Sequence, residues 1–142
     1  MTASSTTLLL PALVLMLITL LVWVLLFIRR IAAINAQQIA PEAMQTSEKF
    51  TAMLDDRTNA PSNCLKNLFE MPVLFYAICA FISFSGAVDS IYINLAWGYV
   101  IFRAIQALIH CSYNAAMHRF YAYLASCLLL WAMVIRFFLA LV

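Results

Sequence analysis

Residues 8–30 read LLLPALVLMLITLLVWVLLFIRR, and this stretch decides the fold class. It has no charge before Arg29 and Arg30, and as a helix rising about 1.5 Å per residue it would cross the roughly 30 Å hydrocarbon core of a bilayer. The preceding MTASSTT has no basic residue and no A-x-A cleavage site follows, so we expect a retained span rather than a signal peptide. The chain is 66% hydrophobic and 10% charged, far more apolar than a soluble domain.

Three further apolar stretches predict an antiparallel bundle. We expect the first span at about residues 8–28 and the others, joined by short turns, at about 64–84, 91–111 and 119–142. The chain of 142 residues is therefore expected to form one all-α membrane domain with four transmembrane helices. Residues 30–62 contain helix formers interrupted by Pro41, a pattern that fits either an extension of the first helix or a partly ordered loop.

Basic residues predict how the four spans are oriented. The first loop carries several, whereas the second carries none: Arg29, Arg30, Lys49, Arg57 and Lys66. Because Lys and Arg concentrate on the cytoplasmic side, we expect the first and third loops in the cytoplasm and both termini on the opposite side. The basic residues are scattered without interleaved aromatic residues, which predicts no nucleic-acid surface. The four cysteines and two histidines have no metal-binding spacing, so we expect no metal site and reduced, packed cysteines.

Polar residues at helical spacing interrupt the second and third spans. Two sets each share one helix face, at spacings i, i+4, i+7 and i, i+3, i+7: Asn63, Asn67 and Glu70, and Arg103, Gln106 and His110. On this topology Glu70 and Arg103 lie about 10 Å and about 12 Å from the cytoplasmic ends of their helices. A charge at that depth costs roughly 2.5–3.5 kcal/mol on insertion scales. We therefore expect Glu70 and Arg103 to pair, either to hold helices together or to form part of a ligand site.

Two arginines lie near opposite ends of the fourth span. Arg119 begins it at the cytoplasmic boundary, and we expect it to join the polar set of the second and third spans. Arg136 lies near the far end, and we expect it to anchor that end at the opposite interface.

These residues resemble the MAPEG family, the membrane-associated proteins in eicosanoid and glutathione metabolism. The resemblance runs from the second span to the end of the chain, and it is carried by NLFE at residues 67–70 together with Arg103, His110 and Arg119. Family members have an arginine where this chain has Asn63, with Lys66 on a neighbouring face. They have a tyrosine where this chain has His110, with Tyr113 three residues further on.

The resemblance implies a bacterial-type homotrimer of the inner membrane. Glutathione would bind in a polar groove between subunits, open to the cytoplasm, and react there with a lipophilic electrophile or hydroperoxide from the bilayer. The implied binding residues are Asn63, Lys66, Asn67, Glu70, Arg103 and Gln106. The implied catalytic residues are Arg119, which would stabilise the thiolate, and His110 or Tyr113, which would donate a hydrogen bond to it.

Two other classes of function stay open from the sequence. The departures at Asn63 and His110 also fit a non-catalytic MAPEG-like binding protein or an accessory subunit of a larger membrane assembly. A third reading is a structural subunit whose polar cluster only stabilises contacts between helices. Glutathione binding would separate the first class from the second, and a stoichiometric partner would identify the third.

Overall fold

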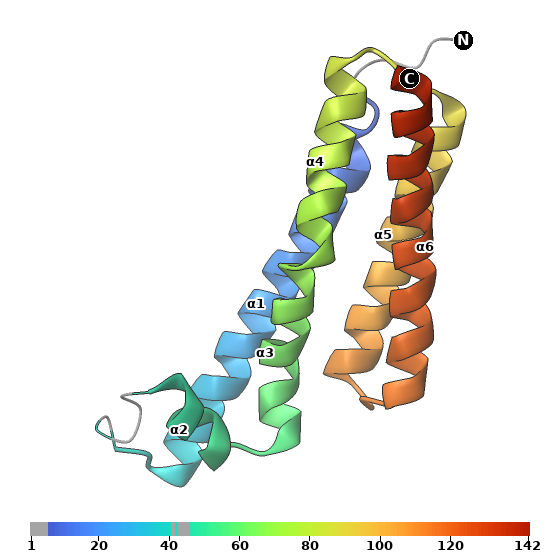
Figure 1. Cartoon of the computed structure of the whole chain (residues 1–142). Helices are drawn as coiled ribbons and strands as arrows, with labels where there is room; N and C mark the ends of the chain where they lie inside the picture. Colours follow the sequence, from blue (N-terminus) through green and yellow to red (C-terminus); the bar gives the residue numbers. More distant parts are fainter. Residues whose placement is uncertain (1–5, 41, 43–45) are drawn as a thin grey trace.

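The structure, a computed structural model, describes residues 6–40, 42 and 46–142. Over these residues it contains no strand, and its helices are α1 (Leu9–Gln37), α2 (Ser47–Met53), α3 (Asp56–Leu68), α4 (Met71–Phe84), α5 (Ser90–Cys111) and α6 (Ala116–Leu141). Figure 1 shows α1 running alongside α3 and α4, while α5 and α6 form an antiparallel hairpin beside them. The start of α1 and the end of α6 lie at the same end of the bundle.

Four helical stretches are long and apolar enough to cross a membrane, as the sequence predicts. They are Leu9–Gln37, Asp56–Phe84, Ser90–Cys111 and Ala116–Leu141. Only 28–39% of the most apolar window of each stretch is buried inside the protein. The remaining apolar side chains face outward, which in water would expose a very large apolar surface. The chain is therefore a multi-pass membrane protein.

The first helix is longer than its membrane span. We predicted the span to end at about residue 28, and α1 continues to Gln37, so the extension of the first helix is confirmed. Arg29 and Arg30 mark where the helix becomes polar, but arginine is a good helix former and does not end it. The helix ends at Gln38, which has a left-handed backbone with a φ of 50°.

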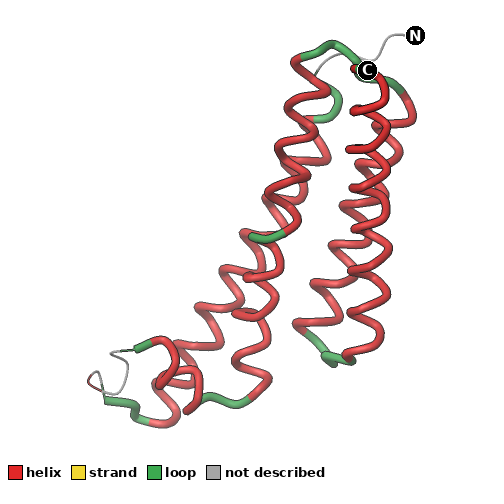
Figure 2. Tube along the Cα trace, in the orientation of Figure 1, coloured by secondary structure: helices red, strands yellow, loops and turns green. Residues whose placement is uncertain are grey.

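The second span begins earlier than predicted and is broken in the middle. Asp55 caps α3 by accepting a hydrogen bond from the Thr58 amide at 3.0 Å, so the helix starts at Asp56 rather than at about residue 64. The chain leaves the helical conformation at Phe69 and Glu70 and resumes it at Met71. Pro72 in the first turn of α4 has no amide hydrogen to continue the helix. Figure 2 shows this break as a short loop between α3 and α4.

The α5–α6 hairpin is fixed at its far end by a salt bridge. Asp89 caps α5 through the Tyr92 amide at 3.0 Å and also accepts a hydrogen bond from Arg136 Nη1 at 2.9 Å. The Arg136 guanidinium holds the pKa of the Asp89 carboxyl below its usual value, and it lies 4.1 Å from the centre of the Tyr92 ring. We predicted an interface anchor at Arg136, which stays a prediction; the structure adds that its side chain ties α6 to the start of α5.

Apolar packing joins the hairpin to the rest of the bundle. The Phe75 ring of α4 stacks on the Tyr99 ring of α5, with 4.3 Å between their centres. Within the hairpin, Gly98 lets α5 approach α6 closely, because a Cβ at this position would lie 2.9 Å from Leu129 Cδ1. These contacts hold α5 against α4 on one side and against α6 on the other.

Candidate functional site

A groove of about 480 Å³ opens where α3 faces the connector end of the α5–α6 hairpin. Its lining comes from three helices: Asn67, Gln106, Ala116, Met117, Arg119, Phe120 and Tyr123. The structure thus brings together three of the residues that the sequence predicted for the site, Asn67, Gln106 and Arg119. The volume falls within the roughly 300–1,000 Å³ typical of small-molecule sites.

Arg119 lies in the first turn of α6 and lines the groove. Its Nη1 donates a hydrogen bond to Asn114 Oδ1 at 2.7 Å, across the short connector from α5. Asn114 has a left-handed backbone with a φ of 55°, a conformation that asparagine tolerates better than most residues. The α6 N-cap, Ala115, has no side chain that can accept a hydrogen bond from the first-turn amides. A guanidinium and the positive end of a helix dipole therefore meet at one edge of the groove.

Arg103 is completely buried directly behind the groove wall. Its Nη1 donates to Gln106 Oε1 at 2.9 Å and its Nε donates to the Tyr99 hydroxyl at 3.2 Å. The guanidinium carbon lies 4.7 Å from the centre of the Tyr123 ring. Among the described residues, Nη2 has no hydrogen-bond partner. A buried guanidinium whose partners are all neutral is costly, and it places a positive charge behind two residues that line the groove, Gln106 and Tyr123.

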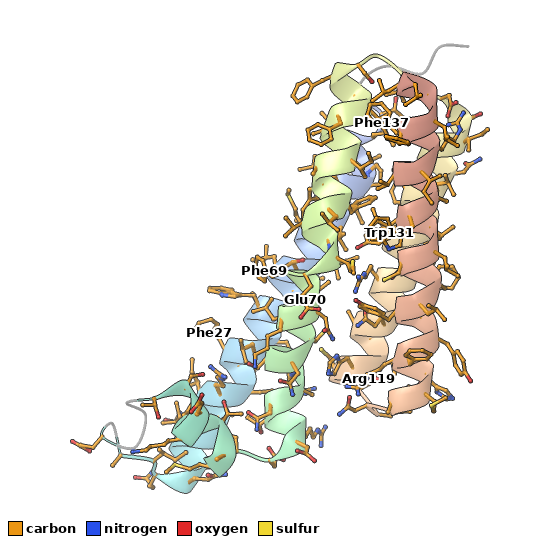
Figure 3. All side chains as sticks on the ribbon, viewed as in Figure 1. Phe27, Phe69, Glu70, Arg119, Trp131 and Phe137 are labelled. Atoms are coloured by element: carbon orange, nitrogen blue, oxygen red, sulfur yellow. The ribbon has the colours of Figure 1, made fainter. Side chains whose placement is uncertain are left out.

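The predicted pairing of Glu70 with Arg103 is wrong. Within the part of the chain that the structure describes, the only salt bridge joins Asp89 to Arg136, and the Arg103 partners are neutral. Glu70 lies exposed on the protomer, in the break between α3 and α4 (Figure 3). The prediction treated Asn67 and Glu70 as neighbours on one continuous helix, and the break at Phe69 and Glu70 interrupts that phase.

The other predicted residues lie outside the groove lining. Asn63 and Lys66 are exposed on α3. His110 is only 3% exposed, and its Nδ1 has no partner among the described residues. Tyr113 is 62% exposed, and its hydroxyl forms a hydrogen bond with His118 Nδ1 at 3.1 Å. Neither predicted hydroxyl or imidazole donor therefore reaches the groove lining in the protomer.

Sequence reasoning missed Tyr123, which supplies a hydroxyl-bearing ring to the groove. It also missed Tyr99, which is completely buried and holds Arg103. Both tyrosines could have been predicted from their spacing. Tyr123 follows Arg119 by four residues, and Tyr99 precedes Arg103 by four. Residues four apart on a helix lie on one face, so a tyrosine at that distance from a predicted site arginine is a candidate member.

Two further predictions concern the cysteines and the metal-ligating residue types. All four cysteines are free, and Cys64, Cys79 and Cys127 are buried, which fits the predicted packing role. In the described ranges, no group of three or more His, Cys, Asp or Glu side chains is placed to hold a metal ion. The groove is the pocket that collects three of the predicted site residues, Asn67, Gln106 and Arg119.

Comparison with known proteins gives a family-level result. The MAPEG family model matches residues 8–139, which is nearly the whole chain. Comparison with curated proteins and with solved structures found no match. MAPEG proteins are membrane proteins generally linked to glutathione, which agrees with the four apolar helices and with the polar groove. The chain therefore belongs to the MAPEG family.

Proposed function

We propose that the groove binds glutathione and activates its thiol for reaction with a lipophilic substrate, as a membrane-bound transferase or peroxidase. One observation carries the proposal: Asn67, Gln106 and Arg119, from three helices, line one groove with the buried Arg103 charge behind it. Family membership supports a glutathione-linked role. A groove that gathers positive charge suits a tripeptide with two carboxylates and an ionisable thiol.

Arg119 is the group that we assign to the thiolate. A thiol loses its proton more readily beside a cation and at a helix N-terminus, and Arg119 combines the two at the start of α6. The Tyr123 hydroxyl, one turn further along α6, is a second donor that the sulfur could use. Asn67 and Gln106 offer amides to the peptide backbone. Glu70, exposed at the helix break, is the carboxylate available to the amine of glutathione.

The second substrate would come from the bilayer. Met117 and Phe120 make one side of the groove apolar, and a separate apolar groove of about 310 Å³ runs between α4 and α6, with Trp131 and Phe137 in its wall. Figure 3 shows these two residues further along α6 than Arg119. In conjugation, the thiolate sulfur would bond to an electrophilic carbon, which expels its leaving group or passes the electron pair to an attached acceptor. With a hydroperoxide, the sulfur would bond to the terminal oxygen as the O–O bond breaks; the alkoxide takes a proton to leave as an alcohol, and a second glutathione reduces the resulting sulfenic acid, giving glutathione disulfide and water.

A homotrimer would complete the site. Glu70 is exposed on the protomer at a depth where an ionised carboxylate facing lipid is costly. A neighbouring subunit packed over the α3–α4 break would shield Glu70 and cover the open side of the groove. With the connector between α5 and α6 in the cytoplasm, glutathione would enter from the cell interior.

Substitution of Arg119 tests the proposed role of this residue in activating the thiol. Arg119→Ala should lose glutathione conjugation of a hydrophobic electrophile, with kcat falling about 10²–10³-fold as when a key transition-state donor is removed. Arg136→Ala is the matched control, since its side chain lies at the far end of α6 and pairs with Asp89. Unchanged activity in Arg119→Ala, or an equal loss in both variants, would refute the role of Arg119.

One observation favours a second candidate, a MAPEG protein that binds glutathione without catalysis. The residue at the family tyrosine position, His110, lies outside the groove lining, and the Tyr113 hydroxyl is engaged with His118. In that case glutathione would bind as the thiol. Ultraviolet difference absorption of the bound ligand at neutral pH separates the two candidates, because only the thiolate absorbs near the edge of the peptide band.

A further inference from the structure

Arg29 joins three helices that are far apart in the sequence. Its Nη1 donates a hydrogen bond to the backbone carbonyl of Arg57 in α3, and its Nη2 donates to that of Cys111 at the end of α5, each at 2.7 Å. Both are short, charge-assisted contacts made by one planar group. A residue that served only to mark the membrane boundary would need neither of them.

The α3 carbonyl that Arg29 contacts lacks its usual helical partner. In an α-helix the carbonyl of residue 57 accepts a hydrogen bond from the amide of residue 61. Residue 61 is a proline inside α3, and proline has no amide hydrogen. The Arg57 carbonyl therefore has no i+4 amide donor within its helix, and Arg29 donates to it instead.

The α5 carbonyl lacks a partner for a different reason. Cys111 is the last residue of α5, and the final carbonyls of a helix have no amide ahead of them to accept from. The chain reverses immediately afterwards, with the Asn114 amide returning to the Ile109 carbonyl at 2.8 Å. The Cys111 carbonyl is the negative end of the helix, where a cation is favourable, and Arg29 provides that cation.

The end of α5 in turn places Arg119. Asn114 follows Cys111 by three residues, and its Oδ1 accepts the 2.7 Å hydrogen bond from Arg119 Nη1. A shift of the α5 end would therefore move Asn114 and with it the guanidinium at the edge of the groove. The contacts run from Arg29 to the Cys111 carbonyl, through the connector to Asn114, and on to Arg119.

We propose that Arg29 is a positioning residue for Arg119: it fixes the end of α5, and hence the connector, by donating to two backbone carbonyls that, among the described residues, lack an i+4 amide donor. This inference rests on the proposed function, because Arg119 is assigned there to the thiolate. Lysine at position 29 would keep the charge at the membrane boundary, but a single ammonium does not reproduce the planar fork that contacts both carbonyls. Charge and positioning can therefore be separated by one substitution.

The first test needs no glutathione. Arg29→Lys is compared with Arg30→Lys, a control that also keeps its charge but whose contacts are the Ser62 hydroxyl and the Phe50 ring. Hydrogen exchange of the hydrogen-bonded amides within residues 112–119, those of Ser112, Asn114 and Arg119, should become about tenfold faster in Arg29→Lys alone, because the connector loses its anchor. Equal exchange in the two variants would overturn the inference, whatever the protein does with glutathione.

The second test measures the kinetics and pH dependence of glutathione conjugation, which report on thiolate formation. In Arg29→Lys, kcat for conjugation should fall about tenfold to a hundredfold, KM for glutathione should change less than about threefold, and the acidic limb of the pH–rate profile should move to higher pH. Arg30→Lys should keep the wild-type profile. Wild-type protein without glutathione-dependent activity would refute the proposed function. An active wild type with matching profiles in both variants would refute only the role of Arg29.

A third variant separates positioning from stability. Pro61→Ala gives α3 back the amide that the Arg57 carbonyl lacks, so it replaces one of the two contacts of Arg29 but not the contact to Cys111. In the Arg29→Lys background it should restore resistance to unfolding while the fast exchange of residues 112–119 and the low kcat persist. Recovery of kcat together with stability would show that Arg29 acts only through the overall stability of the fold.

Discussion

Replacing Arg103 with methionine should weaken glutathione binding and leave the stability of the protein nearly unchanged. The side chain makes two hydrogen bonds, to Tyr99 and Gln106. At about 1.5–3 kcal/mol for each bond to a charged group, their loss costs about 3–6 kcal/mol. Removing a buried guanidinium that lacks a carboxylate partner returns several kcal/mol of desolvation penalty, roughly the same amount. Methionine also keeps most of the apolar stem that packs in the core.

For glutathione binding, no gain from removing the buried charge offsets the loss of Arg103. Without Arg103 the groove loses the positive charge behind Gln106, and the Gln106 side chain loses the donor that orients it. A loss of about 1.4–2.8 kcal/mol in binding corresponds to a Kd that rises about tenfold to a hundredfold. Isothermal titration with glutathione measures the affinity, and unfolding of the detergent-solubilised protein, followed by circular dichroism, measures the stability.

The control is Arg136→Met, which removes an arginine that pairs with Asp89 outside the groove. It should leave the glutathione Kd within about twofold of wild type. The reasoning is refuted if Arg103→Met unfolds far more readily than wild type yet binds glutathione with the same Kd, because Arg103 would then be structural only.

Three further predictions follow from other contacts. Gly98→Ala should destabilise the α5–α6 hairpin by about 1–3 kcal/mol, since the added methyl meets Leu129 Cδ1, and a second change, Leu129→Ala, should relieve part of that cost in unfolding measurements. Because the Asp89 pKa is lowered in the folded protein, its contribution to stability should be present above about pH 4 and lost as pH falls further, with a total below about 1 kcal/mol. Arg136→Gln should flatten that acid dependence, and a dependence equal to wild type would contradict the assignment. Glu70→Gln should raise the glutathione Kd about tenfold but leave the Kd of a glutathione analogue without the amino group unchanged; equal losses for both ligands would refute the assignment of Glu70 to the amine.

Much of the fold could be predicted because the hydropathy of a segment largely determines whether it inserts into the membrane as a helix. The third span was predicted at residues 91–111 and α5 covers Ser90–Cys111, since the polar turns on either side leave little choice. The start of α3 could not be found in the same way. Pro61 resembles the first turn of a helix, where proline is favourable, and the actual start depends on a hydrogen bond from Thr58 to Asp55.

Three predicted residues from three helices, Asn67, Gln106 and Arg119, do line one groove, but side-chain contacts could be predicted from spacing only within a continuous helix. Gln106 and Arg103 keep the phase that their spacing implies, and the structure brings them into contact. The prediction that Asn67 and Glu70 share one helix face failed because the helix is broken between them. A prediction from sequence spacing assumes an unbroken helix. No sequence pattern could predict the contacts of Arg29, because its partners are backbone carbonyls, which every residue possesses.

A density map of the detergent- or nanodisc-embedded protein with saturating glutathione tests the central claim most directly. The account predicts tripeptide density in the groove beside Asn67, Gln106 and Arg119, with the sulfur next to the Arg119 guanidinium. An empty groove at saturating ligand, or glutathione bound elsewhere on the protein, would contradict it.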